Sequence, residues 1–437
     1  KTPRPIPLRS KKEMHMGKRF ILLLLVLPVF CYVTRAEGQS VKLTLQEAGQ
    51  RFATCNLELI AERYNIDIAE AEVIQARLFE NPVISLEQNV YNRLNGKYFD
   101  VGKKGEAVVE IEQLIYIAGQ RNKRVRVEKL NKEMAVYQFE EVLRTLRSEL
   151  NSKFIEIYYT RKSLSVYDKE IDYLERLLEA MKEQNEKGNI SLLEKSRIQA
   201  LLLSLQQERN DALNRLIALQ GDMRLLLGLE ADETFEPVFD ASVLKQMDTG
   251  AVPFAELSER LAGRPDMKMA RTNIQVSRAN VSLQKSLAFP EVSLKGSYDR
   301  AGNFCDNYFA VGLSISVPVF NRNQGNIKSA RLAVLQNTNR EELARQQAET
   351  ELFTSYARLE KAVKLYRSSN FELERDFGTI IEGVNSNYQK RNISLLEFID
   401  YYQAYKETCL QLYQTEKDVF LAMEEVNTVT GSDVFSY

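Results

Sequence analysis

Six residues occur twice in this chain, 203 positions apart. Asn189-Ile190-Ser191-Leu192-Leu193-Glu194 returns as Asn392-Ile393-Ser394-Leu395-Leu396-Glu397. Each copy is preceded by about 70 residues of helical character and followed by about 40 more. This context predicts a sharp turn at the end of a long helical hairpin. Because the turn occurs twice in the same surroundings, it also predicts a duplicated unit.

The chain of 437 residues is too long for one ordinary hydrophobic core, which predicts two units of about 200 residues. Residues 1–36 are set aside, because Met16-Gly17-Lys18-Arg19, an apolar run and Thr34-Arg35-Ala36 have the three regions of a secretory signal peptide. We expect cleavage after Ala36. Cys31 leaves open a lipid-attached alternative, which is disfavoured because Phe30 stands where a small residue is needed.

Removal of this leader changes the charge and the chemistry of the chain. The remainder has a net charge of −8, which argues against nucleic acid as a partner. It has no histidine, since His15 lies in the leader, so a Ser-His-Asp centre or a usual zinc site cannot form. Cys55 and Cys409 are expected in the core and Cys305 in a surface loop. We therefore predict no enzymatic activity, no metal and no cofactor.

The hydrophobic periodicity predicts one order of elements in two structural repeats. The first repeat, 37–228, contains a helix from a capping box at Thr44 to about residue 80, a β-hairpin over 82–116, an uninterrupted helix over 119–187, and a helix over 191–228. An equatorial linker covers 229–263. The second repeat, 264–431, contains a helix, a β-hairpin over 290–320, an uninterrupted helix over 324–391, and a helix over 394–428, before a tail at 432–437. Pro82 and Pro290 mark the helix-to-strand breaks.

The strands constrain the assembly more than any other element. No apolar run after the leader reaches 18 residues, so no helix is expected to cross a bilayer. The four strands alternate apolar and polar residues, as transmembrane strands do, but four strands cannot close a barrel, and open edges are not tolerated in lipid. Two copies would give a barrel filled by its own side chains, whereas three would leave a lumen. The predicted fold is α+β and mainly α, with long antiparallel α-helical hairpins forming an α-barrel. Four transmembrane β-strands per protomer contribute to a shared trimeric 12-stranded β-barrel.

The order of these elements resembles the outer-membrane efflux protein (TolC) family along essentially the whole chain after the leader. Arg264-Pro265-Asp266, the prolines before the strands and the Gly-Asn and Arg-Asn tips are similar to the family pattern. The run from Pro318 to Gly325 resembles the heavy-metal efflux branch in particular. The resemblance implies a passive homotrimeric conduit in the bacterial outer membrane that extends into the periplasm. It also implies docking, through a periplasmic adaptor (membrane fusion) protein, onto an inner-membrane pump of the RND type, with metal ions as one candidate cargo.

Two groups of residues are candidates for function. Glu397 and Asp400 share a helix face after the second tip, and the resemblance implies that this pair constricts the closed periplasmic gate. A capping box is another explanation for the presence of Glu397. For Glu194, the third gate candidate, a capping box explains the residue by itself. The adaptor-docking tips are the second group: Gly188, Asn189, Ile190, Ser191, Arg391, Asn392, Ile393 and Ser394. They are equally compatible with simple turns.

Two other functions remain compatible with the pattern. The same duct would serve a type I protein secretion system. A periplasmic coiled-coil adaptor also has long hairpins, but it is disfavoured because an adaptor has one hairpin and lacks amphipathic strands. The cargo, whether metal ion, drug or protein, is not written in the chain.

Overall fold

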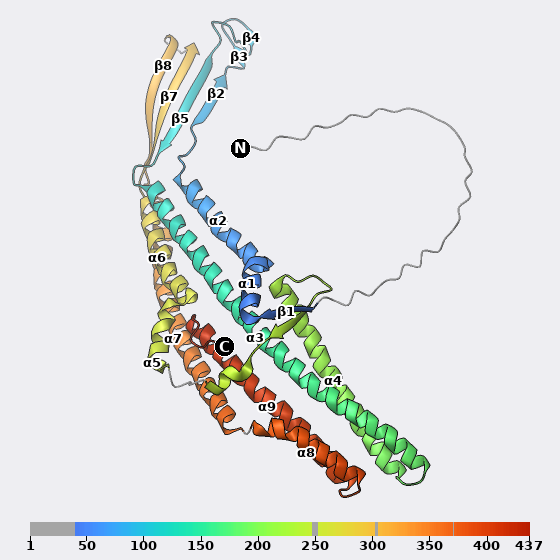
Figure 1. The fold of residues 1–437 in the computed structure, drawn as a ribbon. Helices are drawn as coiled ribbons and strands as arrows, with labels where there is room; N and C mark the ends of the chain where they lie inside the picture. Colours follow the sequence, from blue (N-terminus) through green and yellow to red (C-terminus); the bar gives the residue numbers. More distant parts are fainter. Residues whose placement is uncertain (1–39, 247–251, 302–304, 370) are drawn as a thin grey trace, which may run out of the picture. The chain divides into compact units, whose positions relative to one another are not determined.

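The computed structural model describes residues 40–246, 252–301, 305–369 and 371–437 (Figure 1). The expected leader, with its cleavage point and Cys31, lies outside the described residues. Most of the described chain is helical, and its strands gather mainly in one sheet, so the predicted α+β class with mainly α content is confirmed.

The first half of the described chain follows the predicted order. Its elements are β1 (Ser40–Thr44), α1 (Leu45–Cys55), α2 (Leu57–Arg77), β2 (Val83–Gln88), β3 (Tyr91–Asn92), β4 (Lys97–Tyr98), β5 (Ala107–Ile115), α3 (Gln120–Glu186) and α4 (Leu192–Leu227). The 67-residue helix α3 runs without a break, as its periodicity predicts.

The second half repeats this order after an irregular connection. Its elements are β6 (Thr234–Val238), η1 (Ala241–Gln246), α5 (Phe254–Arg260), η3 (Leu261–Gly263), α6 (Pro265–Ser286), β7 (Glu291–Ala301), β8 (Asp306–Ser316), α7 (Gln324–Ser368), α8 (Glu372–Gln389) and α9 (Leu395–Thr430).

Two helices predicted as continuous are each divided. The first is broken at Asn56, whose side-chain oxygen accepts a hydrogen bond from the Leu59 backbone N–H at 2.8 Å and caps α2. The second is broken after Ser368, because Ser369 has an extended backbone (φ −82°, ψ 138°) that ends α7 before α8 begins. The prediction of an uninterrupted helix over 324–391 was therefore wrong. The break at Asn56 leaves Cys55 at the end of α1. Cys55 is exposed there, so the prediction that it lies in the core was wrong.

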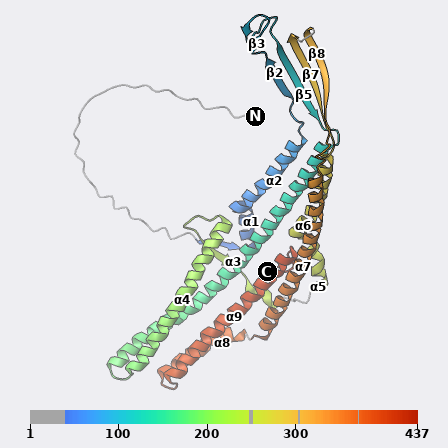
Figure 2. The same ribbon diagram turned by 180° about the vertical axis from the view of Figure 1, so that it is seen from behind.

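The strands β2, β5, β7 and β8 form one antiparallel sheet in the order β2-β5-β7-β8 (Figure 2). Both predicted hairpins are present and are joined through β5 and β7. Within the predicted hairpins over 82–116 and 290–320, β2 ends at Gln88 and β8 ends at Ser316, and Pro318 lacks the N–H that a longer ladder would need.

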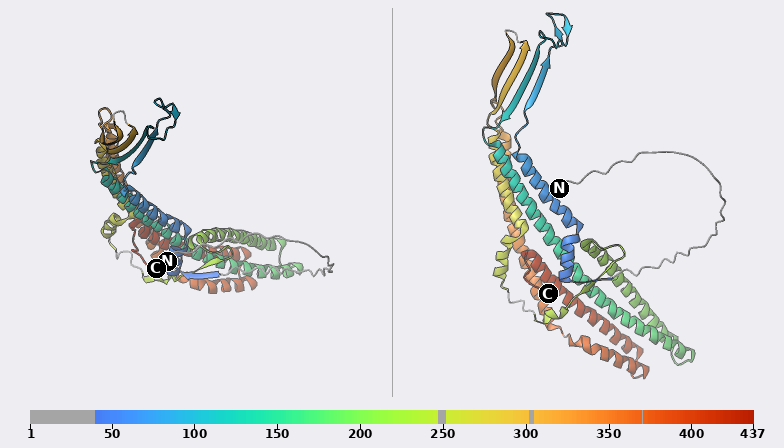
Figure 3. Two further views of the ribbon diagram at one scale, coloured as in Figure 1. Left: turned by 90° about the horizontal axis from the view of Figure 1, so that it is seen from above. Right: turned by 45° about the horizontal axis from the view of Figure 1, so that its top comes forward.

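Four helices continue the order of the sheet. Helix α3 packs against α2 and α6, and α6 packs against α7, giving the sequence α2-α3-α6-α7 (Figure 3). Each helix is directly followed or preceded in the chain by the strand of the same rank. Further along, α3 packs against α4 and α9, and α9 packs against α7 and α8. The long α3 thus connects both sets of packed helices.

Strands β1 and β6 were not predicted. They pair in parallel, from Ser40 opposite Thr234 to Thr44 opposite Val238. Strand β6 lies in the expected linker, and Phe235 from it is fully buried with residues of α1, α3 and α4. This small sheet fixes the start of the described chain to the middle of α3.

Arg264, from the motif before α6, is a buried cross-link. Its guanidinium donates to the Asp266 carboxylate at 2.6 and 3.0 Å, to the Glu351 carboxylate at 2.9 Å and to the Val429 carbonyl at 3.1 Å. Such a planar fork is suited to binding several oxygens at once. The Arg-Pro-Asp motif therefore joins α6, α7 and α9.

Candidate functional site

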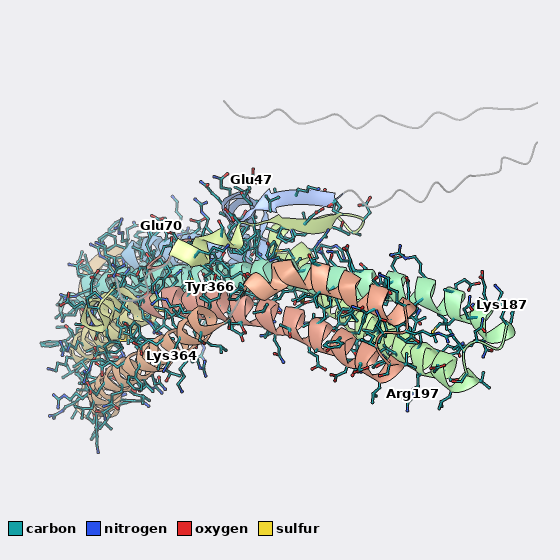
Figure 4. The ribbon with its side chains drawn as sticks, turned by 60° about the horizontal axis from the view of Figure 1, so that its bottom comes forward. Glu47, Glu70, Lys187, Arg197, Lys364 and Tyr366 are labelled. Carbon is teal, nitrogen blue, oxygen red and sulfur yellow. The ribbon has the colours of Figure 1, made fainter. Side chains whose placement is uncertain are left out.

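The two tips that follow α3 and α8 are built in the same way. The residues at equivalent positions, Gly188 and Arg391, have left-handed backbones, with φ of 73° and 61°. The next backbone N–H, of Asn189 or Asn392, donates to a carbonyl five residues back at 2.9 or 2.8 Å. This is a Schellman-type helix end, which satisfies carbonyls that the helix leaves unpaired. Figure 4 shows Lys187 at the end of the first hairpin.

Side chains reinforce both turns. The Asn189 amide donates to the Gln184 side-chain oxygen at 2.9 Å, and the Asn392 amide donates to that of Asn387 at 3.1 Å. The tip residues predicted from the repeated sequence therefore form two equivalent turns, and the alternative of simple turns accounts for their backbone geometry.

The two tips of one chain also touch each other. The Arg391 Nη2 group donates to the Asn189 carbonyl at 3.1 Å. Arg391 therefore has a left-handed backbone, which is uncommon for a residue other than glycine, and a cross-tip hydrogen bond. The repeated sequence did not reveal this contact, because the two copies differ at this position.

Both helices that leave the tips begin with a capping box. The Ser191 and Ser394 hydroxyls accept from the backbone N–H groups of Glu194 and Glu397 at 3.2 Å each. In return, the Glu194 and Glu397 carboxylates accept from the Ser191 and Ser394 backbone N–H groups at 3.0 and 2.7 Å. The backbone N–H of Ser394 lowers the pKa of Glu397 from its usual value, because it stabilises the charged carboxylate. The predicted capping role of both glutamates is confirmed.

Asp400 lies one turn beyond the second capping box and differs from Glu397. Its side chain is exposed. Within the described part of the chain, its carboxylate makes no hydrogen bond or ion pair. Glu397 therefore has a capping role in this protomer, whereas the described residues supply no such contact for Asp400.

Apolar side chains near the tips divide into two kinds. Leu395 is buried beside Phe398, as expected for a packing residue. Leu193 is 66% exposed. Leu192 and Leu396 are exposed to a similar degree, at 68% and 66%. The starts of α4 and α9 thus present leucines to solvent in the protomer.

Aromatic rings fill the space between the hairpins just behind the tips. Tyr402 stacks on Tyr173 with ring centroids 5.5 Å apart and on Phe398 at 5.1 Å. Tyr388 lies 4.8 Å from Phe398. Tyr402 is buried, so these rings belong to the packing between the hairpins.

Further along α9, buried charges join the two hairpins. The Lys406 ammonium, from α9, donates to both Glu208 oxygens, from α4, at 2.8 and 3.0 Å. Glu170, on α3, is buried nearby, and its Oε1 atom has no hydrogen-bond partner among the described residues. Burial raises the pKa of Glu170 to about 8, against the opposing charge of Lys406. Sequence reasoning missed this cluster, because single charged residues in a long helix look like solvent-exposed residues when only the sequence is read.

The sheet separates two kinds of face. Residues paired across the strands share a face, so Leu86, Val109, Tyr298 and Phe309 lie together on an apolar one. The opposite face carries Lys295, whose ammonium lies 3.2 Å from Glu110 and 3.1 Å from Glu112. Pro82 and Pro290 precede β2 and β7 and mark the changes from helix to strand.

No helix among the described residues is long and apolar enough to cross a membrane. The same residues contain no group of three or more histidine, cysteine or acidic side chains placed to hold a metal ion.

Comparison with known proteins identifies the family. A family model described as outer membrane efflux protein matches residues 48–229 and 257–369, which is more than half of the chain. The chain belongs to the outer membrane efflux protein family. Membership of the outer membrane efflux protein family places the chain in the bacterial outer membrane, as the sequence predicts, and this family is not one of enzymes.

Curated relatives and solved structures of the outer membrane efflux protein family agree with this assignment. The cobalt-zinc-cadmium resistance protein CzcC of Cupriavidus metallidurans is 23% identical over 292 residues, covering 66% of each chain. The pyoverdine export outer membrane protein OpmQ of Pseudomonas aeruginosa is 24% identical over 300 residues, covering 64% of this chain and 57% of OpmQ. The match thus spans less than two thirds of the length of these relatives.

Solved structures extend the likeness to nearly the whole fold. A crystal structure of CusC matches with a TM-score of 0.72 and 17% identity, covering 90% of this chain and 93% of CusC. The Campylobacter jejuni CmeC outer membrane channel matches with a TM-score of 0.74 and 13% identity, covering 90% of this chain and 87% of CmeC. The predicted resemblance to the family is therefore confirmed, and the strands and hairpins described above are those of the family fold. The heavy-metal branch stays a prediction.

Proposed function

We propose that this protein is a passive conduit of a tripartite efflux system, formed by three copies that share one β-barrel and one α-helical tube. The carrying observation is the common order of strands and helices, β2-β5-β7-β8 and α2-α3-α6-α7. Both layers end on the same two sides, so one protomer is a section of a wall. Residues 37–228 and 264–431 are then the two structural repeats within that section, and the linker 229–263 joins them.

The two sides of the section support closure by further copies. Among the described residues, β2 and β8 each have a strand on one side only, and open strand edges are not tolerated in lipid. The edge helices carry exposed apolar side chains along their length. On α2 these are Leu57, Tyr64, Ile68 and Ile74, and on α7 they are Leu332, Leu335, Leu343 and Phe353. If the side of one copy that carries β2 and α2 packs against the side of the next copy that carries β8 and α7, both the open strand edges and the exposed apolar side chains are covered.

Three copies give twelve strands, whose apolar face would meet lipid and whose polar face would line a water-filled lumen. The ion pairs of Lys295 with Glu110 and Glu112 would then lie in the lumen. The duct has no chemical step to perform, so the pump that feeds it selects the cargo. Metal ions are the first candidate class, because relatives include cobalt-zinc-cadmium and nickel-cobalt-cadmium resistance proteins.

The periplasmic end would be gated by acidic side chains. Glu397 and Asp400 from three copies would place six carboxylates around the narrow end, with Glu194 at its margin. A ring of carboxylates would retain cations at the constriction and repel anions, so its charge would slow the passage of ions. The Arg391 contact with the Asn189 carbonyl would hold the two tips of each copy together.

The tips are also the proposed docking surface for a periplasmic adaptor, which links the duct to an inner-membrane pump of the RND type. Exposed Leu192, Leu193 and Leu396 beside the turns support this role, because apolar side chains at an exposed end suit a partner surface. The turns themselves present Gly188 to Ser191 and Arg391 to Ser394.

The gate is tested by single-channel conductance of the purified trimer in planar bilayers. Replacing Glu397 and Asp400 together by Ala, or Asp400 alone by Asn, should raise the conductance, because charge at the constriction is removed. Glu47→Ala is the matched control. Glu47 forms the same capping box with Thr44, at 2.8 and 3.3 Å, but lies in α1. Loss of that box costs about 1 kcal/mol, and the conductance should stay unchanged. Equal conductance in the Asp400 variants and the wild type would reject the gate.

A further inference from the structure

The segment that joins β2 to β5, residues 89–106, is a folded unit with a buried carboxylate at its centre. Asp100 is 8% exposed. Its carboxylate accepts from the Asn92 side chain at 3.1 Å, from the Gly102 backbone N–H at 2.9 Å, and from the Asn95 side chain. Strands β3 and β4 pair within the segment. These bonds hold the backbone in one conformation, so the side chains that point outward have fixed directions.

Two side chains from the sheet attach this segment to the rim of the apolar face. Gln88, in β2, donates to the Asp100 carbonyl at 3.1 Å, and Arg300, in β7, donates to the Val101 carbonyl at 2.7 Å. Side chains alternate between faces along a strand. Gln88 therefore shares the face of Leu86, and Arg300 shares that of Tyr298. The hydrogen bonds from Gln88 and Arg300 therefore both come from the apolar face of the sheet, and not from the face that carries Lys295.

The segment presents apolar side chains to solvent. Leu94 is 88% exposed, Tyr98 73%, Phe99 61% and Val101 77%. Phe99 also has a left-handed backbone, with φ of 47°, which is rare for a bulky residue. Residues in such conformations are kept where the surrounding structure determines them, and often where a side chain must be presented.

The same segment carries four cations and two acids, which is a net charge of +2. Its exposed cations are Arg93, Lys97, Lys103 and Lys104. None of them forms an ion pair within the described ranges. Of the two acids in the segment, Asp100 is occupied by the internal hydrogen bonds. Aromatic and apolar side chains next to unpaired cations match the chemistry of an anionic lipid surface, where rings enter the headgroup boundary and cations meet phosphates.

We propose that residues 89–106 bind the lipid leaflet around the outer end of the sheet, with apolar side chains in the headgroup–acyl boundary and cations on lipid phosphates. This inference rests on the proposed function, because it requires the apolar face of the sheet to meet lipid. The attachment through Gln88 and Arg300 favours lipid over a lid above the lumen, since a lid would be held from the polar face.

The chain contains no tryptophan, so a single introduced tryptophan is a specific probe. Tyr98→Trp would report on the segment, Phe309→Trp on the apolar face of the sheet, and Tyr308→Trp on the polar face. Each full-length variant is reconstituted into phosphatidylcholine vesicles with brominated acyl chains, which quench tryptophan on contact. Tyr98→Trp and Phe309→Trp should be quenched relative to unbrominated vesicles, and Tyr308→Trp should not.

The pattern of quenching separates the two proposals. If Phe309→Trp is quenched and Tyr98→Trp is not, the duct stands and the lipid anchor is rejected, in favour of a lid over the lumen. If Phe309→Trp is not quenched, the transmembrane sheet and the anchor fail together. Val101→Trp gives a second reading of the segment in case Tyr98→Trp disturbs the contact of Tyr98 with Tyr91, whose ring centroid lies 5.0 Å away.

Phosphate binding is tested with diphosphorylated lipid A and its dephosphorylated form, measured as lipid bound per trimer by native mass spectrometry. The test variant changes Arg93, Lys97, Lys103 and Lys104 to Gln. Each cation near an anionic surface is worth about a fivefold change in binding, so the variant should bind diphosphorylated lipid A at least about fivefold more weakly. A matched variant changes four exposed cations of α7 to Gln, namely Arg331, Arg340, Lys361 and Lys364, and should bind as the wild type does. Equal binding by the test variant and the wild type would overturn the phosphate contact.

Discussion

Glu170 has a pKa that couples the stability of the hairpins to pH. Its carboxylate, on α3, is buried with one oxygen unpaired, and Lys406, the cation whose charge acts on it, is bound to Glu208. Burial raises the pKa from its ordinary value of 4.5 to about 8. The folded protein therefore holds a proton that the unfolded chain releases. The free energy of unfolding should fall as the pH rises from about 4.5 to about 8, and recover as the pH is lowered again.

Replacing Glu170 by Gln should remove this dependence, because the amide stays neutral. At pH 8 the variant should be more stable than the wild type by about 2–4 kcal/mol, whereas near pH 4.5 the two should be similar. Thermal melting of the helices followed by circular dichroism between pH 5 and 8.5 measures the effect. The control is Glu186→Gln, an exposed glutamate at the end of α3, whose melting should follow the wild type. A parallel loss of stability in Glu170→Gln and the wild type would show that Glu170 is not the titrating group.

At the residue scale, the sequence predicted groups that act locally and missed those that act across the fold. The capping glutamates Glu194 and Glu397 were legible because a capping box is complete within four residues. Glu170 and Lys406 were not, because their partners come from helices more than 30 residues away. Arg391 carries a left-handed backbone that its residue type disfavours, so only its place in the repeat could have suggested it.

At the scale of elements, the 67-residue helix α3 carries packing in both helical layers. Leu174 is fully buried in the cluster behind the tips. Leu174→Pro should destabilise the protein by about 3 kcal/mol or more, because proline removes a hydrogen bond and clashes within the preceding turn. The yield of folded trimer and the melting temperature should both drop. Leu192→Pro is the control, since Leu192 is the first residue of α4, is exposed, and follows the extended Ser191, where proline is tolerated. A normal trimer yield from Leu174→Pro would contradict the conclusion that α3 is continuous at this point and that assembly depends on it.

Element boundaries were predictable where one periodicity held over many turns, as in α3 and in the strands of the sheet. The break between α7 and α8 was missed, since the helical spacing of apolar residues continues on both sides of Ser369 and no proline or glycine marks the change. The β1–β6 pair was missed for a different reason. Its five-residue strands lie 194 positions apart, and a parallel pairing at that distance has no local pattern.

At the scale of the whole molecule, the two sides of the protomer differ, and this decides how copies combine. One side presents β2 and α2, and the other presents β8 and α7. A contact between unlike surfaces is heterologous, and it produces a closed ring when the rotation between copies closes. The proposed trimer is such a ring. The sequence suggested the number of copies from the strand count, but the assignment of sides needed the observed order of strands and helices.

The sides can be disabled separately. Leu335→Lys with Leu343→Lys should disable the α7 side, and Tyr64→Lys with Ile68→Lys the α2 side, because buried unpaired charge is costly and the same charge on both sides cannot form compensating pairs in a mixture. Each double variant should lose the trimer in detergent, measured by light scattering coupled to size-exclusion chromatography. Val238→Lys, an exposed apolar position on β6 outside both sides, should stay trimeric.

Mixing the two double variants leaves one intact contact, between the α2 side of the first and the α7 side of the second. The mixture should therefore form heterodimers that cannot close, whereas a contact between like surfaces would give no heterodimer. Trimers in either double variant alone would reject the assigned sides.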